Sequence, residues 1–174
     1  MRSYRLFMGL ITGLVFVSCG GGEDGVLHEG QYHVGAGSGR SLRIPGMGTV
    51  FLKPGTTIGL AKGFGRDNRD IDIDGEALFE MVVTGAPVRL HTKDLDVLVL
   101  WAARFRVDGY RGKAGEEVDL LEGQLRVTKN YHSDTDSATE VLGPGEMVMI
   151  NREIDLMEKE KMSQAEIDRV KAMR

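Results

Sequence analysis

The clearest pattern in the chain is a strict alternation of apolar and acidic residues that begins at Ile71. Side chains of a β-strand point alternately to opposite faces, so Ile71 and Ile73 would share a buried face while Asp72 and Asp74 face water. Gly75 interrupts the alternation, and a mostly apolar run follows it. Because glycine adopts positive φ without a Cβ clash, the stretch predicts a strand, a tight corner at Gly75 and a second strand.

The same corner occurs further along the chain. Residues 121–127 repeat the order of an aliphatic residue, an acid, a glycine (Gly123) and a return strand. Two Pro-Gly pairs, Pro54-Gly55 and Pro144-Gly145, set shorter turns between apolar runs. These corners predict an all-β body of short strands that is either wound, in the manner of a β-helix, or meandering.

Two further apolar runs add strands to this body. Residues 88–92 alternate, and residues 95–101 are apolar enough on both faces to form a central strand. Trp101, the last residue of the second run, is then expected to lie in the core. The first and last strands of the body, at 31–34 and 148–150, are expected to be edges whose unpaired backbone groups can accept a partner's strand.

The chain changes character after residue 151. Ser163 and Glu166 have the spacing of a capping box, in which each side chain bonds the backbone N–H of the other residue. Ile167, Val170 and Met173 follow at helical spacing. Residues 152–174 therefore predict a tail with a short helix that docks on the β body or frays from it.

The order and spacing of these segments resemble the FecR domain, the periplasmic sensor module of FecR-type anti-sigma regulators. The match covers residues 49–151, within a β domain expected at 26–151, and departs from the family at Ala102-Ala103, where the family usually has Gly-Thr. The central match is the Gly-Glu-Ala-Leu-Phe-Glu segment at 75–80. The positions that carry the resemblance are Gly55, Gly75, Glu76, Phe79, Phe105, Gly123 and Gly145.

The N-terminus has the organisation of a lipoprotein signal. Two early arginines precede an apolar run at 6–17, which is too short for a transmembrane helix and typical of a signal peptide, here residues 1–18. Cys19 follows in a lipobox-like context and is the only cysteine, so no intramolecular disulfide is possible. The alternative is an unmodified thiol. We expect lipid on Cys19 to hold the protein in the bacterial cell envelope, with residues 19–25 as a flexible tether, facing the periplasm or the cell surface.

The charge of the chain argues against nucleic acid as a partner. Cleavage before Cys19 would leave 20 basic and 26 acidic residues, a formal net charge of about −6. No basic cluster with interleaved aromatic residues occurs along the sequence.

No pattern of catalytic or cofactor-binding residues is present either. Residues 70–75 reproduce the first half of an EF-hand loop, but position twelve, which should be a glutamate, falls on Met81, so an exposed acidic strand face is expected instead of a calcium site. The four histidines lack metal-ligand spacing, and no serine lies in a nucleophile elbow. We therefore expect no enzyme activity, no cofactor and no small-molecule substrate.

Two functions remain open. The resemblance implies a module that senses or relays the state of another envelope protein. The alternative is a structural or adhesive envelope lipoprotein with no signalling role. Direct antagonism of a sigma factor is not expected, because the sequence has no recognisable cytoplasmic segment and transmembrane helix of the kind that FecR-type regulators use.

Overall fold

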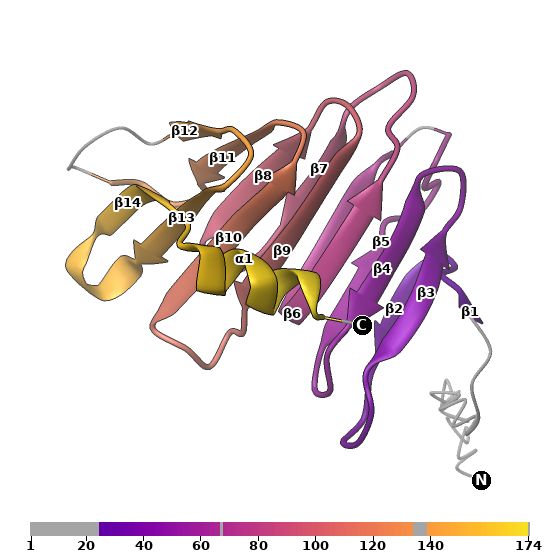
Figure 1. The fold of residues 1–174 in the computed structure, drawn as a ribbon. Helices are drawn as coiled ribbons and strands as arrows, with labels where there is room; N and C mark the ends of the chain where they lie inside the picture. The colour runs from indigo at the N-terminus through magenta and orange to yellow at the C-terminus, as the bar shows by residue number, and fades with distance from the viewer. Residues whose placement is uncertain (1–24, 67, 134–138, 174) are drawn as a thin grey trace, which may run out of the picture.

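The computed structural model describes residues 25–66, 68–133 and 139–173. Fourteen strands form a continuous hydrogen-bonded sheet that is folded into two layers around one core (Figure 1). One α-helix, α1 (Gln164–Lys171), lies on the outside of this body. The predicted all-β class with a short C-terminal helix is confirmed. Among the described residues, no helix is long and apolar enough to cross a lipid bilayer.

The two layers share one long strand, β6 (Asp70–Met81). The other strands of layer A are β1 (Gly25–Val26), β3 (Arg40–Ile44), β4 (Gly48–Leu52), β9 (Ala103–Gly109), β10 (Gly115–Glu122), β13 (Glu146–Asn151) and β14 (Leu156–Lys161). Those of layer B are β2 (Gly30–His33), β5 (Thr57–Leu60), β7 (Val88–His91), β8 (Leu95–Val99), β11 (Leu125–Lys129) and β12 (Thr139–Leu142).

The chain winds between the layers as a series of hairpins. The β7–β8 and β11–β12 hairpins belong to layer B, and the β9–β10 and β13–β14 hairpins belong to layer A. Each connection between successive hairpins therefore crosses from one layer to the other. The tips of the four hairpins meet at one end of the body, where Asn130 bonds Thr92 and Arg152 bonds Asp94.

Strand β6 corrects the predicted corner at Gly75. Residues 70–81 form one strand and not two, and the strand bends where it leaves layer B for layer A. Gly75 has the positive φ that the sequence predicted, 139°. A Cβ there would lie 2.5 Å from Thr56 Oγ1 and 2.6 Å from Thr56 Cα. Only glycine fits this bend, because both the backbone angle and the close approach exclude a side chain.

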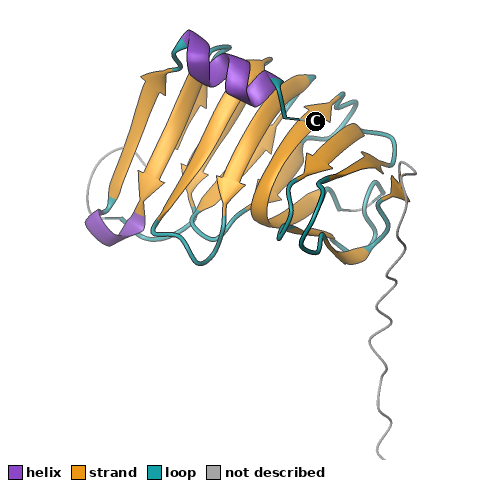
Figure 2. Ribbon diagram, turned by 60° about the horizontal axis from the view of Figure 1, so that its bottom comes forward, coloured by secondary structure: helices purple, strands orange, loops and turns teal. Residues whose placement is uncertain are grey.

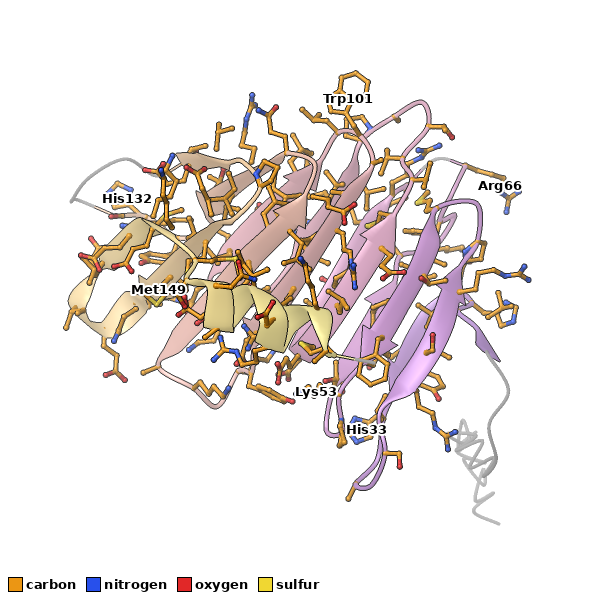
Figure 3. The ribbon with its side chains drawn as sticks, viewed as in Figure 1. His33, Lys53, Arg66, Trp101, His132 and Met149 are labelled. Carbon is orange, nitrogen blue, oxygen red and sulfur yellow. The ribbon has the colours of Figure 1, made fainter. Side chains whose placement is uncertain are left out.

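Apolar positions from both layers fill a single core. Phe79 and Phe105 lie opposite each other on β6 and β9, and their rings stack with centroids 5.1 Å apart. Ile71 and Ile73 are buried, as the alternation predicted. The predicted core position of Trp101 is wrong, because its side chain is 66% exposed (Figure 3). Strand β8 ends before it, so Trp101 lies in the crossing to layer A, outside the alternation of the sheet.

The C-terminal segment is part of the body. β14 pairs with β13 along its whole length, although the sequence predicted no strand there. Ser163 caps α1, and its capping box with Glu166 is confirmed. Helix α1 crosses the outer face of layer A (Figure 2). Val170, the buried residue of α1, and Met173, which follows the helix, form an apolar cluster with layer A residues. The layer A members of that cluster are Leu78, Leu121 and Met147.

Candidate functional site

The edges of the two layers are the first candidate surface. Among the described strands, β2 pairs only with β5, so the edge predicted at residues 31–34 is confirmed. The edge predicted at 148–150 is wrong, because β13 lies between β10 and β14. The edge position belongs to β14, a strand that the sequence pattern did not predict.

Strand β2 is an open and uncharged edge. All four of its residues are exposed, and none of them is Asp, Glu, Lys or Arg. Just beyond it, the Val34 N–H donates to the Thr56 carbonyl over 2.8 Å. Hydrogen bonding alternates along an antiparallel strand, so Tyr32 also directs its backbone groups to β5, and Gln31 and His33 direct theirs outward. The outward N–H and C=O groups can pair with an added strand.

Strand β14, in contrast, is a guarded edge. Glu158, Lys159, Glu160 and Lys161 alternate in sign, so one face of the strand carries acids and the other carries lysines. Directly opposed residues of an antiparallel pair lie on the same face. Two copies of β14 would therefore oppose Glu to Glu and Lys to Lys, which is destabilising. Charged side chains of this kind are a common protection of edge strands.

A buried arginine organises the outer face of layer A. The Arg106 side chain, 8% exposed, bonds Glu76 over 2.8 Å and Asp119 over 2.7 Å. It also contacts Glu117 and, over 3.1 Å, Asp108. These groups come from β6, β9 and β10, so the cluster ties three strands together on the face that α1 partly covers.

Burial sets the protonation behaviour of this cluster. It raises the pKa of Asp119, which is fully buried, to about 6, and the charge of Glu117 adds to the rise, while Arg106 lowers it. Burial alone would lower the pKa of Arg106, but its bonds to Glu76 and Asp119 raise it overall, so the guanidinium stays charged. Glu117 is also bridged by Arg169 of α1 over 3.6 Å. The ion-pair cluster on layer A therefore also contacts α1, through the pair between Glu117 and Arg169.

A second polar cluster joins the hairpin tips. The Lys129 side chain is fully buried, and its Nζ donates to Asp155 Oδ1 over 3.0 Å and to Ser133 Oγ over 2.9 Å. Arg152 bonds the buried Asp94 over 3.0 Å. These contacts fix loops that are distant in sequence, and we assign them a structural role.

The residues that carry the FecR resemblance lie at turns between layers and in the core. Gly55, Gly123 and Gly145 have φ values of 80°, 93° and 78°. A Cβ on Gly123 would lie 2.3 Å from the Ala102 carbonyl oxygen. Glu76 bonds Arg106 through its side chain, and its backbone N–H and C=O both bond Thr56 Oγ1.

The acidic run at 70–74 lies on an extended strand. Asp70, Asp72 and Asp74 occupy the outer face of layer B and do not wrap around a common point. Beside them, His91 bonds Asp96 over 2.7 Å and lies 3.8 Å from Asp70. Within the part of the chain that the structure describes, no group of three potential ligands is arranged to hold a metal ion. Cys19 lies outside the described residues.

Comparisons with known proteins identify a shared fold. No protein-family model matches the chain, and no curated protein gives a significant match. Two crystal structures, at 1.65 and 2.50 Å resolution, are similar and are described as "a putative anti-sigma factor from Parabacteroides distasonis ATCC 8503". Their TM-scores are both 0.68, with 23% and 22% identity over 79% of this chain. The chain spans 62% of the length of those proteins.

Proposed function

We propose that this chain is a FecR-like protein-interaction and signal-sensing module that a lipid on Cys19 anchors in the bacterial cell envelope. It binds another envelope protein by adding a strand of that protein to β2. The observation that carries the proposal is an open, uncharged edge on a fold similar to that of proteins described as anti-sigma factors. The FecR resemblance of residues 49–151 supports the same assignment.

The geometry of β2 favours strand addition over other binding modes. The outward backbone groups of Gln31 and His33 supply hydrogen bonds, and exposed side chains on both faces supply specificity. Of the other edge strands, β14 is protected by its charge alternation, β12 carries Glu140, and β1 is two residues long. We therefore assign the partner strand to β2, which is uncharged and four residues long.

Replacing Gln31 by proline is expected to abolish partner capture while the fold is retained. Proline removes the outward N–H of residue 31 and leaves the bonds between β2 and β5 in place. Pull-down from membrane extracts of the native host, followed by quantitative mass spectrometry, should recover a set of proteins with the wild type and lose it with Gln31→Pro. Gln31→Ala, which keeps the N–H, should recover the set.

Lys159→Pro is the matched control, because it places the same substitution on the guarded edge. The proposal is overturned if Gln31→Pro recovers the wild-type set, or if Lys159→Pro loses it equally. Transcript profiles of the host then separate the two functions. If Gln31→Pro changes the same transcripts as deletion of the protein, the contact relays a signal, whereas a deletion without effect on transcription favours the structural or adhesive role.

Replacing Cys19 by alanine is expected to move the protein from the membrane fraction to the soluble fraction. The acyl chains on Cys19 would be its attachment to the bilayer, and stable anchoring requires such chains. Cell fractionation and immunoblotting measure the partition. An unchanged membrane fraction would contradict the lipid anchor.

A further inference from the structure

A groove on the outer face of layer A lies beside the turn that joins β13 to β14. Its volume is about 340 Å³. The apolar side chains that line it include Met149, Ile154 and Leu156. Ile154 is 67% exposed and Leu156 is 37% exposed, so two of the large exposed apolar side chains of the described residues meet in this groove. An exposed apolar surface of this kind is typical of an interaction site.

The rim of the groove is acidic. Asp108, Glu117 and Glu158 line it, and none of its lining residues is a lysine or an arginine. Asp108 is paired with Arg106 and Lys113, and Glu117 is paired with Arg106 and Arg169. Glu158 is exposed and forms no ion pair within the described chain. Its charge is therefore available to a partner.

Helix α1 indicates what such a surface accepts. On the same face of layer A, Val170 of α1 and Met173 just after it pack in an apolar cluster, and Arg169 of α1 lies 3.6 Å from Glu117. An apolar stripe with a basic flank is thus already bound on the neighbouring part of this face. The groove floor is the outside of a sheet, so an occupant lies along it and is not enclosed as a small molecule would be.

We infer that this groove binds an amphipathic helix of another protein that carries an apolar stripe flanked by lysine or arginine. The apolar stripe covers Ile154 and Leu156, and the basic flank meets Glu158. This binding is independent of strand addition at β2, which lies at the opposite side of the body. The inference therefore goes beyond the proposed function, and either can fail alone.

The test uses the full chain and a fluorescent model peptide of roughly 18 residues, long enough to form a helix, with leucines on one face and lysines on the other. A second peptide carries glutamate in place of every lysine. Fluorescence anisotropy gives the Kd of each. We expect the lysine peptide to bind at least about tenfold more tightly than the glutamate peptide, with an affinity that falls as salt is raised.

Two groove variants and two matched controls locate the site. Ile154→Asp and Glu158→Lys should each raise the Kd of the lysine peptide about tenfold or more, a loss of about 1.4 kcal/mol. Val141→Asp, at a position of layer B that is 44% exposed, and Glu122→Lys, at the far end of the domain, make the same chemical changes elsewhere. These controls should change the Kd less than about twofold, which excludes general attraction to an acidic protein.

Three results would overturn the inference. Equal Kd values for the wild type and both groove variants would show that the peptide does not use this surface. Equal losses in the controls would show non-specific charge attraction. Gel filtration that reveals a dimer of the wild type, lost in Ile154→Asp, would assign the groove to a second copy of this chain. Unchanged melting temperatures of all four variants confirm that folding is not the cause.

Discussion

Replacing Gly75 by valine is expected to destabilise the protein strongly. The φ of 139° is strained for a β-branched residue, at about 1–3 kcal/mol, and the added Cβ would overlap Thr56, whose displacement costs about as much again. Thr56 cannot simply move away, because its hydroxyl bonds both the N–H and the C=O of Glu76. Urea unfolding should show a loss of roughly 2–6 kcal/mol.

Gly112→Ala is the control for this prediction. Gly112 lies in the exposed tip between β9 and β10, its φ is not in the positive range, and a Cβ there would meet no atom within 4 Å. Its substitution should leave stability within about 0.5 kcal/mol of the wild type. A Gly75→Val protein that unfolds at the wild-type urea concentration would contradict the account of β6 as a bend between layers.

Replacing Arg106 by methionine is expected to cost about 3–5 kcal/mol at neutral pH, because it leaves buried carboxylates without their cation. The fully buried Asp119 is the main cause. The loss should shrink in acid, where Asp119 becomes protonated and no longer needs a partner. Arg126→Met, an exposed position on layer B, should change stability by less than about 1 kcal/mol.

The sign of the pH effect follows from the raised pKa of Asp119. Its folded pKa of about 6 exceeds the ordinary value of 3.8, so the folded state binds the proton more tightly than the unfolded state does. This contribution to stability is complete below the unfolded pKa and is lost as the pH rises through about 6. Relative to Asp119→Asn, the wild type should gain about 2 kcal/mol between about pH 7.5 and about pH 4.5. Parallel stability curves for the two proteins would contradict the assignment.

Local patterns in the sequence were sufficient for features that depend on neighbouring residues. The burial of Ile71 and Ile73 follows from period-two alternation, and the Ser163 capping box from a spacing of three residues. The predicted core position of Trp101 was wrong because a continuous apolar run does not show where a strand ends. The run leaves layer B two residues before Trp101, and the side chain then points to water.

Features that depend on the pairing of distant strands could not be predicted. Alternation places Arg106, Asp119 and Glu76 on outward faces, but their contacts require the register of β6 against β9 and of β9 against β10. Strand β14 has no apolar alternation from which a strand could be predicted. Backbone hydrogen bonds to β13 hold it in the sheet. Its alternating Glu and Lys residues were the available signal, since charge of this kind is typical of a protected edge strand.

The most direct test of strand addition at β2 is site-specific photo-crosslinking in living cells of the native host. Tyr32, which is 36% exposed on β2, would be replaced by the similar aromatic crosslinker p-benzoylphenylalanine. The account predicts a discrete adduct with one envelope protein, and its disappearance when Gln31→Pro is added. An adduct that persists in the Gln31→Pro background, or no adduct at all from this edge, would contradict the account.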